Sequence, residues 1–199
     1  MTLRPTGPGP GRPSVARQRR SDIINAYIEI VAEAPTISVA MKEVAERAGV
    51  ARTAVSHFVG DRHDIHTAAI AELRLRYQTR IDTALGTHPT PQQYINVLFS
   101  TDWAVERTAD DRAFDAFIAT AATDLTARTA IRDTYRHFVD QLTSSIKRSG
   151  VPVADPGGVA YAVICLAEFN STLLTLGNEL TWNDRARAIA TQLVAGHET

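Results

Sequence analysis

The feature that most constrains the fold is a glycine between two short helical segments, in the stretch KEVAERAGVARTAVSHF at residues 42–58. Before the glycine, apolar residues recur at i, i+3, i+4 and i+7, which is one face of a helix: Met41, Val44, Ala45 and Ala48. Gly49 follows directly, and glycine leaves a helix through positive φ without a steric penalty. A second short helix is predicted at residues 52–58. The chain therefore turns sharply between two helices that share an apolar face.

The second short helix has a polar face that points away from the first. Val55 and Phe58 are three residues apart and join the shared apolar face, whereas four polar residues fall on the opposite side: Arg52, Thr53, Ser56 and His57. A small residue, a glycine four positions later and an apolar residue six positions after that have the spacing of a helix-turn-helix, here Ala45, Gly49 and Val55. In such units the second helix presents its donors to DNA. The alternative is a surface helical hairpin with a glycine turn.

Charge is distributed unevenly along the chain. Residues 1–62 hold nine Lys/Arg and six Asp/Glu, a net charge of +3, while residues 63–199 hold twelve and sixteen, a net charge of −4. The first twenty residues contain five arginines and no acid: Arg4, Arg12, Arg17, Arg19 and Arg20. Lys and Arg side chains that neutralise phosphates supply sequence-independent affinity for DNA. The alternative for the arginine-rich segment is an ordinary solvated tail.

The N-terminal third resembles the tetracycline-repressor (TetR) family of bacterial transcription regulators. The resemblance runs from Gly11 to about Ile70, through GRPSVARQRRSDIINAYIEIVAEAP and then VAMKEVAERAGVARTAVSHFVGDRHDI. It implies an all-α protein whose third helix enters the major groove and whose fourth helix leads into a regulatory domain. It also implies dimerisation through the last two helices, with a small-molecule cavity between the others.

Several positions depart from the family pattern. Ser56 stands where the family usually has a phosphate-contacting Tyr, and Ala40 and Ala51 stand where Thr or Ser helix caps are common. A missing cap typically costs about 1 kcal/mol of helix stability. Val59 replaces a usual Phe, and Arg62 replaces a common Lys at the start of the fourth helix. These departures concern DNA affinity rather than the fold.

The remaining sequence is also predicted to be helical, with no alternating strand pattern. Further helices are expected at residues 22–34, 62–85, 92–107, 111–122, 126–149, 159–176 and 184–194, with Asp155 and Pro156 opening the helix that follows them. We divide the chain into a disordered basic arm (1–16), a helix-turn-helix DNA-binding domain (17–62) and a helical effector-binding and dimerisation domain (63–199). Residues 159–176 are apolar on almost every side, so this helix needs partners on two faces. We place Leu166 and Leu173 in the dimer interface.

The helices after residue 92 contain many large apolar groups and few charges. Candidate ligand-binding residues are Trp103, Phe114, Phe117, Tyr135, His137, Phe138, Tyr161, Glu168, Phe169 and Asn170. A cavity with this lining favours a mainly apolar or aromatic small molecule held by one or two hydrogen bonds. The alternative is that these aromatic side chains fill a core, and that His137 lies on the surface.

Other function classes have little support in the sequence. Ser56 and His57 are adjacent and point about 100° apart on a helix, so they cannot form a nucleophile–base pair. We find no nucleophile elbow, phosphate-binding glycine loop or H-E-x-x-H motif, and we predict neither an enzyme nor a cofactor. His63, Asp64 and His66 are interpreted as a solvated helix start rather than a metal site. Cys165 is expected to be buried, and no membrane span or signal peptide is expected.

The sequence thus predicts a cytoplasmic, homodimeric, one-component regulator that binds a near-palindromic double-stranded operator as a repressor and is released by a small apolar ligand. The predicted DNA contacts are Arg17, Arg19, Arg20, Lys42, Arg52, Thr53, Ser56, His57 and Arg62. The alternative is a small-ligand-binding or interaction module of the same fold that has lost specific DNA recognition.

Overall fold

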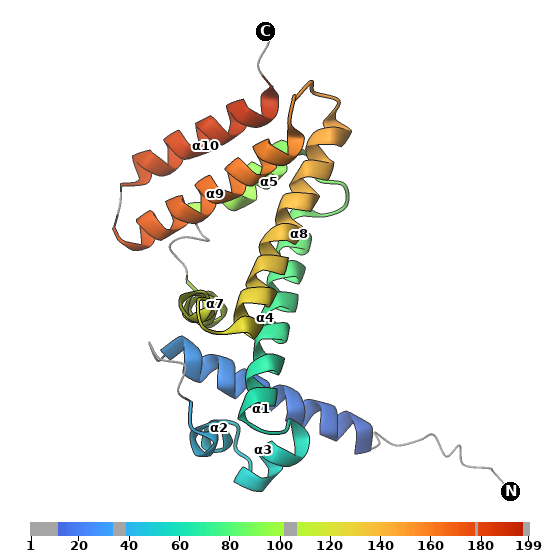
Figure 1. Ribbon diagram of the computed structural model, residues 1–199, viewed down its shortest axis with the longest axis vertical. Coiled ribbons are helices and arrows are strands. Elements are labelled where there is room, and N and C mark those ends of the chain that lie inside the picture. Colours follow the sequence, from blue (N-terminus) through green and yellow to red (C-terminus); the bar gives the residue numbers. More distant parts are fainter. Residues whose placement is uncertain (1–11, 34–38, 102–106, 178, 197–199) are drawn as a thin grey trace, which may run out of the picture. The chain divides into compact units, whose positions relative to one another are not determined.

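The computed structural model describes residues 12–33, 39–101, 107–177 and 179–196. These residues form helices joined by turns and short loops (Figure 1). The helices are α1 (Arg12–Glu33), α2 (Met41–Arg47), α3 (Arg52–Phe58), α4 (Arg62–Leu85), α5 (Pro91–Leu98), α7 (Ala109–Thr120), α8 (Leu125–Ser149), α9 (Pro156–Thr175) and α10 (Leu180–Ala195). The all-α prediction is confirmed.

The helices belong to two compact units. One unit runs to Glu72 and also includes Ala109–Thr120, so it holds α1 to α3, the first half of α4, and α7. The other holds Leu73–Thr108 and the chain from Ala121 onward, and so contains the second half of α4 with α5 and α8 to α10. α7 therefore belongs to the unit that contains the helix-turn-helix and packs against α1, although it lies far from α1 in the sequence. The predicted boundary between a DNA-binding domain that ends at residue 62 and an effector-binding domain that begins at residue 63 stays a prediction.

The first unit is built on the buried face of α1. Ile23, Tyr27 and Val31 recur at four-residue steps and are all almost fully buried. The hydroxyl of Tyr27 lies 3.0 Å from Nδ1 of His66 on α4, and the His66 ring meets the edge of Phe117 on α7. One buried polar contact thus lies where α1, α4 and α7 meet. His66 is therefore buried and is not part of the solvated helix start that the sequence predicted.

The second unit has a core formed by all five of its helical segments. The centre is made of aliphatic side chains that are inaccessible to solvent, including Ile95 on α5, Leu142 and Ile146 on α8, and Val163 on α9. α9 and α10 lie side by side and antiparallel in Figure 1, with α8 against α9. Asp155 accepts a hydrogen bond from the backbone N–H of Gly158 and Pro156 occupies the first turn, so the predicted start of α9 is confirmed.

A buried polar chain links three elements of the second unit. Nδ2 of Asn170 on α9 donates to Oδ1 of Asn183 on α10 over 2.7 Å, and Nδ2 of Asn183 donates to the carbonyl oxygen of Phe99 over 3.1 Å. Phe99 is the C-cap residue directly after α5. The chain fixes the end of α5 against the α9–α10 pair, because buried amide groups need their partners.

Several sequence-based expectations need correction. α1 begins at Arg12, so residues 12–16 are helical rather than part of a disordered arm; Pro13 is compatible with this because the first turn of a helix needs no N–H from it. α5 ends at Leu98, nine residues before the expected end at residue 107. Cys165 is exposed, because it lies on the outer face of α9.

α9 bears on the expectation that the chain has no membrane span, which stays a prediction. By length and composition it is apolar enough to cross a membrane. The core helix of a folded domain satisfies the same test, and α9 packs against α8 and α10 and holds the buried Asn170. Its apolar character is explained by this packing and by an outer face that is described below.

Candidate nucleic-acid interface and ligand-binding regions

The turn between α2 and α3 has the predicted helix-turn-helix geometry. Gly49 has φ +63°, the left-handed conformation that favours glycine. The N–H of Val50 donates to the carbonyl of Ala45 over 3.0 Å and closes the turn. Val44 on α2 and Val55 on α3 are both fully buried, which locks the two helices together through their apolar faces. The crossing of the two helices is thus fixed by small and β-branched residues.

The outward face of α3 carries the four polar side chains that the spacing predicts. Arg52, Thr53, Ser56 and His57 are all exposed. The His57 ring contacts the edge of the Phe58 ring, with 4.9 Å between centroids, so its position is partly restrained. Neither Ala40 nor Ala51 supplies a side-chain cap, as expected for alanine. α3 is therefore held by packing against α1 and α2 rather than by caps.

The predicted phosphate-contacting residues fall into different environments. Arg17, Arg19 and Arg62 are exposed on the surface of the first unit. Arg20 donates from Nη1 to the carbonyl oxygen of Phe58 over 3.0 Å, so it bonds to the last residue of α3. Nζ of Lys42 lies 3.6 Å from Oε1 of Glu46, and both side chains are mostly exposed. Exposed ion pairs are weak, so the Lys42 ammonium can still pair with a phosphate. The role of Arg20 therefore includes holding α3 in place.

Two features of this unit were missed in the sequence. Arg47 donates to both carboxylate oxygens of Glu33, over 2.9 and 2.7 Å, and thereby clamps α2 to the end of α1. This hydrogen bonding lowers the pKa of Glu33 and raises that of Arg47. No local pattern indicates this ion pair, because its two residues are fourteen positions apart on different helices.

The second missed feature is a cap on α4. Oδ1 of Asp61 accepts from the N–H groups of His63 and Asp64 over 2.8 and 3.0 Å, while Oδ2 of Asp64 accepts from the N–H of Asp61 over 2.9 Å. The N–H groups of Asp64 and His63 hold the pKa of Asp61 below its usual value. The motif D-x-x-D before an apolar run is a readable form of the capping box. It fixes where α4 begins behind the α3 helix.

The nine described candidate ligand residues are divided between the two units. Phe114 and Phe117 are buried in the first unit, on α7. Phe138 lies in the core of the second unit, and Asn170 is occupied by its bond to Asn183. Trp103 lies outside the described residues. The expectation of a single aromatic cavity does not describe this arrangement, because the spacing showed faces of helices but not which unit each helix joins.

The other candidates lie toward the surface of the second unit. The Tyr135 hydroxyl donates to Oε2 of Glu168 over 3.0 Å, which joins α8 to α9. Tyr161 and Phe169 are exposed by 63% and 65%. His137 lines an open polar groove beside the loop between α4 and α5.

An apolar space remains in the interior of the second unit. Its volume is only about 10 Å³, and it is lined by Ile81, Leu85, Tyr94, Val97, Leu98, Phe138 and Ile164. Among the described candidates, Phe138 is the one that contributes to it. A drug-sized molecule needs some hundreds of Å³, so a ligand can enter here only if the helices separate.

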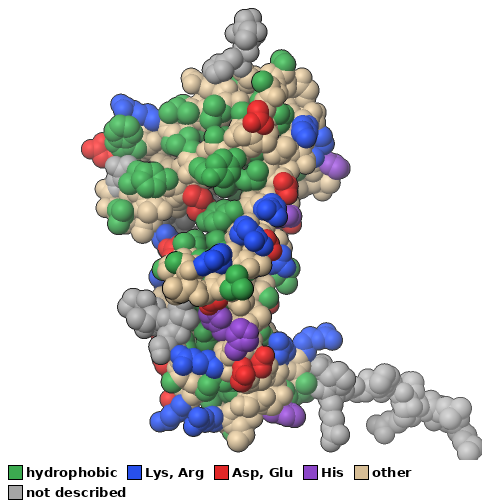
Figure 2. All heavy atoms as spheres, viewed as in Figure 1, with side chains coloured by type: hydrophobic (Ala, Val, Ile, Leu, Met, Phe, Trp, Pro, Cys, Tyr) green, Lys and Arg blue, Asp and Glu red, His purple; other side chains and the backbone are tan. Residues whose placement is uncertain are grey.

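A large apolar surface covers the outer faces of α9 and α10. We name it the α9–α10 surface, and its exposed residues are Tyr161, Cys165, Phe169, Leu176, Leu180, Trp182 and Ile189. Figure 2 shows hydrophobic side chains gathered over these two helices. Leu166 is partly buried and packs against the core, and Leu173 is half-buried, so the two leucines that the sequence placed in an interface are not its most exposed residues.

Comparison with known proteins supports the fold. No family model matches the sequence. The HTH-type transcriptional regulator BetI of Rhizobium meliloti (strain 1021) is 23% identical over 93 residues, which are 47% of this chain and 46% of that protein. The chain thus matches about half the length of this curated relative.

Solved structures match over most of the chain. A TetR transcription regulator from Haloarcula marismortui has a TM-score of 0.71 at 17% identity, covering 89% of this chain and 97% of that one. A transcriptional regulator from Rhodococcus sp. Rha1 has a TM-score of 0.69 at 18% identity, covering 86% and 92%. The multidrug binding protein EbrR, complexed with imidazole, has a TM-score of 0.68 at 17% identity, covering 91% and 97%. The chain has the fold of the TetR-family transcriptional regulators, the family that its N-terminal sequence resembles.

Proposed function

We propose that the protein is a one-component transcriptional regulator that binds double-stranded DNA through α3. The observation that carries the proposal is the exposed polar face of α3 on a rigid helix-turn-helix. Its members, Arg52, Thr53, Ser56 and His57, are exposed, while the opposite side of α3 is buried through Val55. An Arg side chain can form two hydrogen bonds to a guanine edge in the major groove, and Thr or Ser hydroxyls can contact bases or phosphates. The protein acts in the cytoplasm, and no catalytic role is proposed.

Phosphate contacts position the helix in the groove. Arg17 and Arg19 on α1, Lys42 at the start of α2 and Arg62 at the start of α4 are exposed cations of the same unit. They supply the salt-dependent part of the affinity, because each neutralised phosphate releases counterions. Ser56 donates a hydrogen bond to phosphate in place of the family's Tyr. Arg20 contributes through its bond to Phe58, which fixes the end of α3.

The test is a mobility-shift titration with DNA from upstream of the protein's own gene. Arg52→Ala and His57→Ala should each weaken binding, by about 1–3 kcal/mol if the side chain contacts a base edge, and the Arg52 loss should be confined to particular bases. Lys147→Ala removes an exposed cation from the second unit and serves as the control. Unchanged binding by both α3 variants would favour the alternative, a ligand-binding or interaction module without specific DNA recognition.

The α9–α10 surface is proposed to form a homodimer. An apolar surface of this kind on a folded protein marks an interaction site, and two copies of α3 are needed to cover enough base pairs of a near-palindrome with half-sites about one turn or more apart. Phe169→Glu should give monomers in sedimentation velocity. Leu125→Glu is the control, since Leu125 is 71% exposed on α8 away from this surface. A dimer that withstands Phe169→Glu together with Trp182→Glu would place the interface elsewhere.

The proposed regulatory step is release of a repressor by a small, mainly apolar effector. The apolar interior around Phe138 supports this proposal. A ligand that binds better to a minor conformation with a wider interior shifts the protein toward that conformation. Apolar compounds that raise the melting temperature should also release DNA from the parent protein. They should lose both effects in Val97→Phe, because the larger side chain fills the small interior space. Hits that are indifferent to Val97→Phe would exclude this location.

A further inference from the structure

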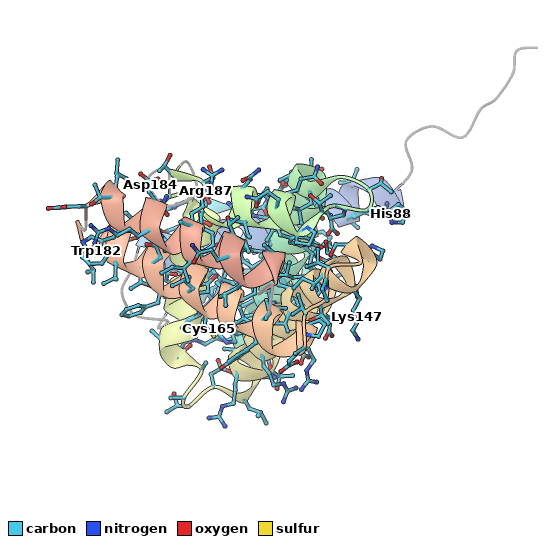
Figure 3. The ribbon with its side chains drawn as sticks, turned by 90° about the horizontal axis from the view of Figure 1, so that it is seen from above. His88, Lys147, Cys165, Trp182, Asp184 and Arg187 are labelled. Atoms are coloured by element: carbon cyan, nitrogen blue, oxygen red, sulfur yellow. The ribbon has the colours of Figure 1, made fainter. Side chains whose placement is uncertain are left out.

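The second unit contains an open polar groove apart from its apolar interior. The groove has a volume of about 420 Å³, within the range of small-molecule sites. Its lining residues are Gly86, His88, Pro89, Tyr94, His137, Asp140, Gln141, Ser144 and Arg148. It lies between α8 and the loop that joins α4 to α5, at the end of the unit where Figure 3 labels His88 and Lys147. Tyr94 separates it from the apolar interior, since this side chain lines both spaces.

One wall is a polar stripe on α8. His137, Gln141, Ser144 and Arg148 follow one another at steps of four, three and four residues, which aligns them on one helical face, and Asp140 lies beside them. The stripe extends over eleven steps along the helix, from His137 to Arg148, or about 16 Å at 1.5 Å per step. The groove is therefore elongated along α8.

The other wall is a loop held firmly against α8. Oγ of Ser145, a buried side chain, donates to the carbonyl oxygen of Pro89 over 2.6 Å. His88, next to it, has φ +55°, a left-handed conformation that is uncommon outside glycine. Such conformations persist where the surroundings hold them in place. The groove is thus built into the unit rather than left between mobile side chains.

Two buried polar atoms beside the groove lack partners among the described residues. Nε2 of Gln141 donates to Oδ1 of Asp82 over 3.1 Å. Because a carboxylate only accepts, this bond fixes the amide orientation and turns Oε1 of Gln141 away from Asp82. Oε1 of Gln141 and Nε2 of His137 are buried without a hydrogen-bond partner. A buried polar group left unsatisfied is costly, so these atoms favour a polar occupant over an apolar one.

The charged groups of the groove have opposite signs and lie apart. Asp140 and Arg148 are both exposed and form no ion pair with a described residue. Their Cα atoms are eight residues apart on α8, or about 12 Å. Long side chains on a helix generally point toward its N-terminus, so we expect the Arg148 side chain to shorten the gap. An occupant that satisfies both carries a cation and an anion at opposite ends.

We propose that this groove is a binding site for a small zwitterion, an amino acid with its ammonium and carboxylate separated by roughly four to six carbon atoms. The carboxylate pairs with Arg148 and the ammonium pairs with Asp140. The ammonium also donates to Oε1 of Gln141, next to Asp140, and the methylene groups between the two ends lie along Ser144. This site is separate from the apolar interior proposed for the effector, and it does not depend on DNA binding.

The test compares three probes of equal length against the full chain: 6-aminohexanoate, hexanoate and hexylamine. Isothermal titration measures the affinities, and the histidine ring signals in proton NMR locate the site, with His88→Gln and His137→Gln assigning the two rings that line the groove. The zwitterion should bind about tenfold more tightly than either singly charged probe, since each of those probes lacks one of the two charge-assisted contacts. It should shift the signals of His88 and His137.

Charge variants then test the assignment of each end. Arg148→Gln should remove the advantage of 6-aminohexanoate over hexylamine, and Asp140→Asn should remove its advantage over hexanoate. Lys147→Gln and Asp184→Asn neutralise exposed charges outside the groove and should leave all three affinities unchanged. Equal affinity for the three probes, no binding at millimolar concentration, or a zwitterion preference that survives both groove variants would overturn the proposal. These measurements use no DNA, so they fail or succeed independently of the proposed regulator function.

Discussion

Replacing Asn183 should destabilise the second unit far more than an average surface change. Asn183 is 3% exposed, and it both accepts from Asn170 and donates to the carbonyl of Phe99. Asn183→Ala leaves two buried polar groups without this partner, at about 1–3 kcal/mol each, so the cost is roughly 2–6 kcal/mol. Water that enters the space left by the amide lowers this toward the smaller value. Urea unfolding followed by circular dichroism, at one protein concentration, measures the loss.

A double-mutant cycle separates the hydrogen-bond chain from simple loss of packing. Asn170→Ala leaves only Oδ1 of Asn183 without its donor, and should cost about 1–3 kcal/mol. In the double variant Asn170 no longer presents an unpaired amide, so the combined loss should fall below the sum of the single losses by about 1 kcal/mol or more. Strictly additive losses, or an Asn183→Ala loss near 0.5 kcal/mol, would refute the view that this chain fixes α5 against α9 and α10.

Two further predictions concern the helix-turn-helix unit. Gly49→Ala should lower the free energy of unfolding by about 1–2 kcal/mol through backbone strain alone, because φ is +63° and an added Cβ would meet no neighbouring atom. Gly49→Asn should lower it less. Equal stability of all three proteins in thermal unfolding would contradict this. Asp61 has a folded-state pKa below its unfolded value of about 3.9, so its capping contribution is present above that pH and is lost as the pH falls through the lower, folded value. Asp61→Asn should keep the cap and flatten the acid limb of a melting-temperature profile; an unchanged acid limb would show that other carboxylates control it.

The helix-turn-helix could be predicted from local sequence because its constraints are local. Gly49, the apolar face through Val44 and Val55, and the polar face of α3 are separated by only a few residues, so periodicity alone fixes their relation. The start of α1 was missed, since residues 12–16 were assigned to a disordered arm although the first turn of a helix accepts Pro13. The bond from Arg20 to Phe58 joins residues thirty-eight apart and has no local signature.

The ligand-binding residues could not be predicted in the same way. Periodicity places Phe117 and Phe138 on the buried faces of their helices, and both are buried. It does not say that α7 joins the first unit while α8 joins the second, which separates these two residues. The polar groove was missed because a third of its lining comes from the loop at Gly86–Pro89, whose approach to α8 depends on the long-range bond from Ser145.

α9 shows that the register of small residues, rather than the size of the largest ones, determines which face is buried. The inward stripe recurs with helical period and is made of Ala160, Val163, Ile164, Ala167 and Asn170. Small side chains let α8 and α10 approach closely, and the one polar member has partners in Asn183 and, through it, Phe99. The large aromatic residues Tyr161 and Phe169 fall between these positions and so face outward. In an isolated chain this aromatic face stays in contact with water. Burying each such side chain in an interface would contribute about 1.5–3 kcal/mol of stability. The same register that completes the core of one chain therefore leaves a surface whose burial favours a second copy.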